Sequence, residues 1–250
     1  MGLRTGTGEI NKKYFSTKYN NEQDWIVKTI NELISYGFNG AGTWSNENAI
    51  RQYNDQTLDK KFSYCPIFNL MSGYGKELKI TKQLSGNIGY PNQCIRTFDP
   101  GFKQYCEKRI PILLAKYKDD PNIIGYFSDN ELPISTKNLE GYLNLPKDDY
   151  GRKAAEKWLH DKHITRDSIT DKHRTEFAGY VADTYYSIVN NILKKYDPNH
   201  MYLGSRLHGS AKFVKEIIQA AGRHCDVISF NYYGSVSYTH LRAHETAANL

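Results

Sequence analysis

The run GYFSDNE at 125–131 is where the residue types most clearly indicate chemistry, because apolar residues pass directly into a polar cluster. A carboxylic acid that aromatic neighbours partly desolvate has a raised pKa, and it can hold a proton at neutral pH for delivery to a leaving oxygen. Glu131 is therefore the candidate general acid. Asn130, beside it, is the candidate hydrogen-bond donor to a substrate hydroxyl. The alternative interpretation is a polar turn ahead of Pro133.

Other candidate substrate-binding residues lie where further predicted strands end. Trp44 and Asn46 offer an aromatic face and an amide, a combination that suits sugars, although Trp44 also fits a core position. Tyr232 is assigned to the substrate as well, from the Asn231–Tyr233 run that ends the last predicted strand. The chain has 20 tyrosines, so coincidence is the competing explanation for that residue.

Arg206 and His208 occupy alternate positions at the end of another predicted strand, so one or both can face a cleft. A buried structural ion pair is the alternative for Arg206. His160, His163 and His173 form an HxxH-like group in a lysine-rich stretch. With no nearby cysteines and no HExxH helix, we predict no metal site there.

The composition restricts the class of protein. The 33 basic and 27 acidic residues give a net charge of +6, but Lys and Arg never form a run longer than two, so we predict no nucleic-acid partner. The four cysteines form no CxxC pair, and we predict that they are free thiols. We predict no membrane insertion, because no window approaches the roughly 18 apolar residues of a spanning helix. No glycine-rich phosphate motif follows a strand, and we predict no cofactor.

Helices and strands are predicted to alternate along the chain. The predicted helices are 22–36, 101–118, 174–196 and 211–221, and the predicted strands are 38–44, 62–71, 122–131, 201–208 and 226–233. This order indicates right-handed βαβ units and a parallel sheet. Long irregular inserts, 72–98 and 132–170, follow strand carboxyl ends, whereas the returns from helix to strand are short. That asymmetry favours an α/β TIM barrel, although a doubly wound sheet also binds ligands at strand carboxyl ends.

DPNIIGYFSDNELP at 120–133 resembles the strand-four signature of the clan A retaining glycoside hydrolases, in which Asn-Glu ends the strand. Over about 22–233 the chain is similar to the family 50 β-agarases. The phrases that carry this resemblance are GFNGAGTWSN at 37–46, FDPGF at 98–102, KDDPNIIGYFSDNELP at 118–133, YDPNHMYLGSRLH at 196–208 and DVISFNYY at 226–233.

The resemblance implies an eight-stranded (β/α) barrel that cleaves a β-linked polysaccharide, an agarose-like galactan, with net retention. Such enzymes use two carboxylates about 5–5.5 Å apart. Glu131 matches the proton donor and Asn130 the ligand of a substrate hydroxyl. The nucleophilic Glu ends strand seven, so if 226–233 is strand six the nucleophile is truncated. The chain would hold strands two to six and be inactive alone.

The resemblance also implies a secreted or periplasmic location. Two alternatives remain for function: a non-catalytic glycan-binding barrel, and another clan A activity such as a β-galactosidase or mannanase. For the nucleophile, a βα unit of at least about 30 residues places the next strand end 30 to 80 residues on.

These patterns and the resemblance divide the chain into three predicted segments. Residues 1–21 are a polar lead-in in which the first strand is missing, and 22–235 form a partial TIM-barrel catalytic domain. Residues 236–250 are a non-native tail, because VSYTHLRAHET at 236–246 looks like a translated transposase sequencing adapter.

Overall fold

The structure is a computed structural model, and it describes residues 17–81 and 89–233. The adapter-like run at 236–246 and most of the lead-in 1–21 lie outside those residues. The described helices are α2 (Glu22–Ser35), α3 (Glu47–Gln56), α4 (Leu70–Glu77), α5 (Pro100–Leu114), α6 (Asn138–Leu143), α7 (Tyr150–Asp161), α8 (Asp171–Tyr196) and α9 (Lys215–His224). The strands are β1 (Gly40–Ala41), β2 (Ser63–Tyr64), β3 (Gly125–Tyr126) and β4 (Met201–Tyr202).

The strands pair in parallel and in chain order. β1 pairs with β2, and β3 pairs with β4. Parallel bridges from Tyr64 to Ile123 and from Ile67 to Phe127 join the β2 segment to the β3 segment. A further parallel bridge joins Leu207 to Phe230. Five parallel segments therefore lie side by side without the reversal of order that marks a doubly wound sheet, and the fold is α/β and partial TIM-barrel-like.

The strands are shorter than the sequence predicts. Two residues in each of the first four predicted strands form a regular ladder, and single bridges continue the pairing. The fifth predicted strand, 226–233, is represented by the bridge at Phe230 alone. Pro66 has no N–H to give to a ladder, so the second segment divides into β2 and the bridge at Ile67. The apolar runs place the strands correctly and overestimate their length.

Residues close in the sequence determine where the helices α2 and α8 begin. Asn21 caps α2, with its Oδ1 accepting from the Asp24 N–H at 2.9 Å, and Gly37 follows the helix at φ +88°. Thr170 and His173 form a capping box that starts α8 three residues before the predicted boundary of 174. α9 continues through Gly222, beyond the predicted end at 221, and ends at His224.

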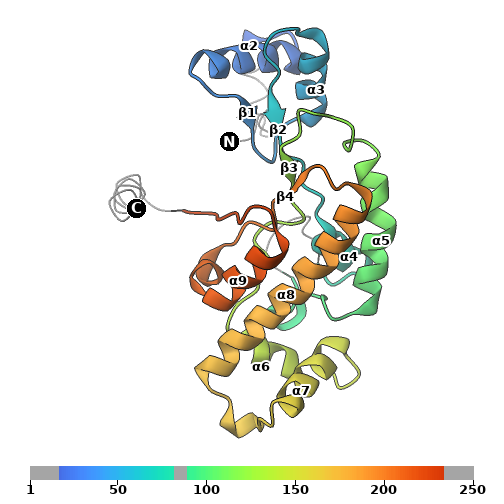
Figure 1. The fold of residues 1–250 in the computed structure, drawn as a ribbon, viewed down its shortest axis with the longest axis vertical. Coiled ribbons are helices and arrows are strands. Elements are labelled where there is room, and N and C mark those ends of the chain that lie inside the picture. Colours follow the sequence, from blue (N-terminus) through green and yellow to red (C-terminus); the bar gives the residue numbers. More distant parts are fainter. Residues whose placement is uncertain (1–16, 82–88, 234–250) are drawn as a thin grey trace.

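The inserts that the sequence predicts as irregular contain helices. Asp149 caps α7 through its side chain, and Ala155, Trp158 and Leu159 form the buried face of that helix. α6 and the 3-10 turn Arg166–Ser168 complete the second insert. Figure 1 shows α6 and α7 at one end of the long axis, beyond α8, and α2 and α3 at the other. The prediction of an irregular 132–170 segment is wrong. Six residues are too few for α6 to give a clear periodic signal, whereas the amphipathic pattern of α7 was present and was missed.

α8 is the central helix of the core, with α5 on one side and α9 on the other (Figure 1). Phe102 of α5 stacks on Tyr185 of α8 with ring centroids 5.9 Å apart. Gly179 lets α9 approach closely, since a Cβ there would lie 2.7 Å from the Cβ of Glu216. In the described ranges no helix combines the length and the apolar character needed to cross a bilayer.

We expect Gly125→Ala to destabilise the fold. A Cβ at this position would lie 2.3 Å from the carbonyl oxygen of Met201, so β3 and β4 must move apart. The expected loss is about 1–3 kcal/mol in the free energy of unfolding. Gly222→Ala is the matched control, because its Cβ meets only the end of the Ile228 side chain at 3.4 Å. Equal urea midpoints for the two variants, followed by circular dichroism, would contradict the close approach.

Candidate active site

Glu131 lies where the β3 segment leaves the sheet. Its N–H donates to the Ser205 carbonyl at 2.9 Å, and the Ser128 N–H donates to the Gly204 carbonyl at 2.9 Å. Glu131 itself adopts φ +53°, in the left-handed region that non-glycine residues rarely occupy. Backbone strain of this kind is found mostly at functional sites, where the surrounding structure holds it.

The Glu131 carboxylate accepts two hydrogen bonds. Asn231 Nδ2 donates to its Oε1 at 2.6 Å, and the Tyr233 hydroxyl donates to the same oxygen. Burial alone would raise the pKa of Glu131, but the hydrogen bonds from Tyr233 and Asn231, with His208 and Arg206 nearby, hold the pKa below its ordinary value. The expectation of a raised pKa is therefore wrong for this arrangement, because the donors outweigh the desolvation.

Asn231 connects the predicted site residues to one another. Its Nδ2 also donates to Asn130 Oδ1 at 3.1 Å, and its Oδ1 accepts from Arg206 Nε at 3.0 Å. His208 meets Tyr233 edge to face, with ring centroids 5.5 Å apart. The structure thus brings Asn130, Arg206 and His208 together with Glu131 at the carboxyl ends of the last three parallel segments.

Tyr232 is placed differently from its neighbours. The Lys212 ammonium lies 3.9 Å from the centre of its ring, and none of the hydrogen bonds to Glu131 comes from it. Asn231 and Tyr233 make those contacts, and the sequence did not select either of them. Side chains alternate along extended backbone, so positions 231 and 233 share one side and 232 faces the other. That alternation is the signal that could have found them.

Trp44 and Asn46 follow β1, the first of the five parallel segments, whereas Glu131 and its partners follow the last three. Trp44 is part-buried and adopts φ +72°. Asn46 caps α3, since its Oδ1 accepts from the Ala49 N–H at 3.1 Å, and only its Nδ2 is left for a ligand. In the described ranges, the reported hydrogen bonds and ring contacts do not connect either residue to Glu131.

Asp129 is a buried carboxylate two residues before Glu131, and the sequence analysis gave it no role of its own. Its side chain is fully buried and accepts from the N–H groups of Met71, at 2.8 Å, and Ser72, at 3.2 Å, at the start of α4. The Tyr185 hydroxyl of α8 donates to it at 2.6 Å. Burial raises the pKa of Asp129 to about 6, although these hydrogen bonds oppose the shift. No local pattern reveals contacts with partners more than fifty residues away.

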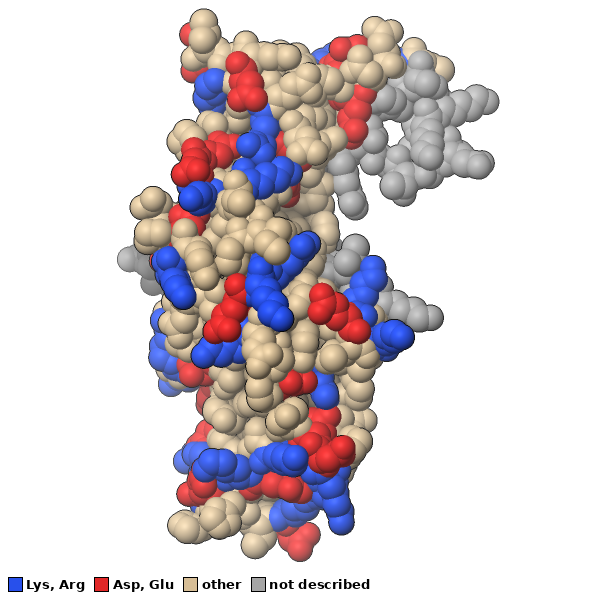
Figure 2. Space-filling model, turned by 90° about the vertical axis from the view of Figure 1, so that its right-hand side faces the viewer, with Lys and Arg blue, Asp and Glu red and all other residues tan. Residues whose placement is uncertain are grey.

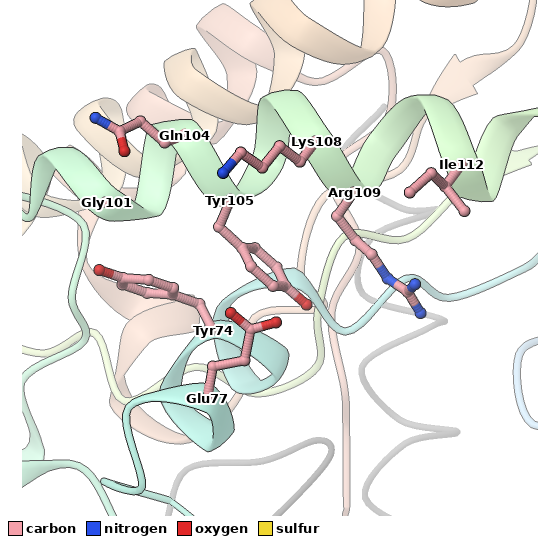
Figure 3. A pocket seen from close by; sticks show the side chains of 8 residues that line it. All are labelled: Tyr74, Glu77, Gly101, Gln104, Tyr105, Lys108, Arg109 and Ile112. Carbon is pink, nitrogen blue, oxygen red and sulfur yellow. The ribbon is translucent and has the colours of Figure 1, made fainter.

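A pocket of about 430 Å³ lies elsewhere, between α4 and α5. Figure 3 shows Tyr105 pointing from α5 toward Tyr74 and Glu77 of α4. None of the predicted site residues lines it. Within residues 17–81 and 89–233, no group of three or more His, Cys, Asp or Glu side chains is arranged to hold a metal ion.

The surface charges are interleaved on the face drawn in Figure 2, where Lys and Arg stand beside Asp and Glu. Among the described residues, ion pairs such as Arg174 with Glu140 and Lys162 with Glu176 join charges of opposite sign. Basic and acidic side chains are thus interspersed on the drawn face.

Comparison with known proteins confirms the resemblance found in the sequence. The chain is 25% identical to β-agarase B of Vibrio sp. (strain JT0107) over 263 residues, which cover 90% of this chain and 26% of that protein. It superposes on the crystal structure of BpGH50 with a TM-score of 0.77 and 30% identity, over 90% of this chain and 50% of the other.

An exo-β-agarase structure shares the fold, with a TM-score of 0.63 and 20% identity over 86% of this chain and 33% of that one. No family model matches the chain. The chain spans about a quarter of the length of β-agarase B and half that of BpGH50.

We expect Tyr233→Phe to raise the pKa of Glu131 toward its ordinary value, because the variant removes a hydrogen-bond donor that favours the carboxylate. Tyr232→Phe is the matched control, since it deletes the neighbouring hydroxyl without touching the Glu131 contacts. A carboxyl ¹³C titration followed by NMR measures both. An equal response to the two substitutions would contradict the assigned contact.

Proposed function

We propose that this chain carries the general acid/base part of the active site of a retaining glycoside hydrolase that cleaves a β-linked, agarose-like galactan. The convergence of Asn130, Arg206, His208 and Asn231 on Glu131 is the observation that carries the proposal. These groups meet at the carboxyl edge of a parallel sheet, which is where TIM-barrel enzymes hold their catalytic residues. The similarity to β-agarase B and BpGH50 supports it.

In this proposal the five parallel segments are strands two to six of an eight-stranded barrel, and residues 22–235 belong to its catalytic domain. The nucleophilic carboxylate then ends strand seven and comes from residues outside those described. The chain alone binds the glycan and does not hydrolyse it, because retention needs both carboxylates.

Glu131 protonates the departing glycosyl oxygen while the second carboxylate attacks the anomeric carbon. In the second step Glu131 removes a proton from water, and that water releases the sugar from the enzyme. The acid role requires a proton that the hydrogen bonds to Glu131 disfavour. The negative charge of the nucleophile raises the pKa of Glu131, and that charge disappears once the glycosyl–enzyme bond forms.

The other residues bind and orient the substrate. Asn130 uses its Oδ1 for Asn231, which leaves its Nδ2 to donate to a sugar hydroxyl. Arg206 and His208 line the same edge, Trp44 supplies a ring face, and Asn46 supplies its remaining amide group. Tyr232 contributes an exposed ring beside Lys212. A polymeric substrate cannot enter a cell, which favours a secreted or periplasmic enzyme.

A non-catalytic glycan-binding barrel is the second candidate. The observation in its favour is the ionised, doubly hydrogen-bonded state of Glu131, which suits an acceptor of sugar hydroxyls as well as a catalyst awaiting its partner carboxylate. Among clan A activities, β-galactosidase and mannanase would use the same chemistry in a differently shaped cleft.

The decisive variant is Glu131→Gln in a polypeptide that continues this chain through a seventh strand ending in Glu. We expect kcat on agarose oligosaccharides to fall about a hundredfold to ten-thousandfold, because the proton donor is lost. Binding of the same oligosaccharides, measured by calorimetry, is expected to change little. Glu107→Gln, at an exposed position on α5, is the control and should leave kcat unchanged.

Unchanged turnover in Glu131→Gln would remove this residue from the mechanism. Tight oligosaccharide binding by a polypeptide with no turnover at all would favour the glycan-binding alternative.

A further inference from the structure

Two basic side chains donate hydrogen bonds to Asn231, which is more positive charge than the proposed reaction requires. Arg206 Nε donates to the Asn231 side chain at 3.0 Å, and Lys212 Nζ donates to the Asn231 carbonyl at 3.4 Å. His208 lies beside Tyr233 on the same edge. Asn231 also donates to Glu131, whose carboxylate lies near Arg206 and His208, whereas Lys212 contacts the Asn231 main chain and the Tyr232 ring.

In the part of the chain that the structure describes, these cations have no carboxylate in direct contact. Among the residues that the structure describes, neither Arg206 nor Lys212 forms an ion pair within 4.0 Å, whereas Arg96, Arg174 and Lys194 each have a carboxylate partner. The Nη groups of Arg206 have no hydrogen-bond partner among those residues. Arg206 therefore keeps a planar pair of donors for an external acceptor.

Aromatic rings cover one side of each cation. The Arg206 guanidinium lies 5.6 Å from the centre of the Phe127 ring, and the Lys212 ammonium lies 3.9 Å from that of Tyr232 and 5.3 Å from that of Phe213. Rings exclude water and reduce the screening of charge, so an anion here is attracted more strongly than at an open surface.

The same rings remain accessible to a glycan. Phe213 is 62% exposed and Tyr232 is 42% exposed. Each offers an apolar face next to Lys212, which suits a pyranose ring that carries a charged substituent.

We propose that Arg206 and Lys212, with His208, bind an anionic substituent on the galactan, a sulfate ester or a carboxylate, next to the bond that Glu131 cleaves. The inference rests on the proposed function and narrows it to charged galactans. Arg206 binds two oxygens of the anion through its free Nη groups, and Lys212 donates one of its remaining N–H groups. A purely structural role, in which both cations only hold Asn231, is the competing explanation.

The test compares binding of three probes to the chain by calorimetry: a sulfated galactan oligosaccharide, its desulfated counterpart and sodium sulfate. We expect the sulfated sugar to bind about tenfold more tightly than the desulfated one, since charge-assisted hydrogen bonds are worth more than neutral ones. The preference should shrink as the salt concentration rises from about 0.05 M to about 0.5 M. A carboxylated oligosaccharide in a parallel arm distinguishes carboxylate from sulfate.

Lys212→Gln should lower the preference for the charged sugar about threefold or more. Lys195→Gln is the matched control, because Lys195 also lies beside a tyrosine ring, Tyr196, at 5.3 Å. It removes the same charge elsewhere and should leave the preference unchanged.

Equal affinity for charged and desulfated sugars would overturn the anionic subsite and leave the proposed function standing. Failure of every sugar to bind would overturn both. Sodium sulfate binding as tightly as the sulfated sugar, or an equal loss in Lys195→Gln, would show a general charge effect and overturn the inference.

Discussion

The pairing between the ends of β3 and β4 determines where everything else in the candidate site lies. Ser128 and Glu131 donate their N–H groups to the carbonyls of Gly204 and Ser205, so the chain turns while it is still fixed to the neighbouring strand. The next parallel bridge, from Leu207 to Phe230, brings Asn231 to the same edge. Two successive pairings thus place three polar strand ends within hydrogen-bond reach of one another.

The end of the β3 segment is also hydrogen-bonded on its buried side, to α8 and α4. The Tyr185 hydroxyl of α8 donates to Asp129 at 2.6 Å and lies 2.8 Å from the Ser128 hydroxyl, and Asp129 accepts from N–H groups in the first turn of α4 as well. Two carboxylates two residues apart therefore have opposite environments. Asp129, whose pKa burial raises to about 6, is enclosed and cannot reach a substrate. Glu131 lies at the edge of the sheet, and its pKa is lowered. Burial thus separates the two carboxylates, and Glu131 is the one placed where the proposed substrate would bind.

The sequence predicts the parts of this arrangement that depend on periodicity and strand order. Asn130, Arg206 and His208 meet Glu131 because the carboxyl ends of parallel strands share an edge, a consequence that needs no side-chain detail. The direction of the Glu131 pKa shift was missed, since it depends on which hydroxyl and amide groups point at it.

The dependence on side-chain contacts also explains why the sequence did not predict the capping role of Asn46 or the helix α6 in the second insert, 132–170. Whether an asparagine at a strand end caps the following helix or faces a ligand depends on its rotamer, and here Oδ1 caps α3. α6 forms against the rest of the fold, with Leu139 and Tyr142 buried, and six residues are too few to form a stable helix alone. Tertiary packing decides such elements, and a local pattern does not contain it.

The electrostatics of the edge connect the proposed reaction to the proposed substrate class. Tyr233, Asn231, His208 and Arg206 all favour the ionised form of Glu131, which is the wrong form for a proton donor. A nearby negative charge opposes that preference, because it disfavours a second negative charge on Glu131. In the proposed reaction the attacking carboxylate supplies one such charge. An anion bound by Arg206 and Lys212 supplies another and offsets the cations that lower the pKa, so a charged galactan would itself help Glu131 to hold its proton.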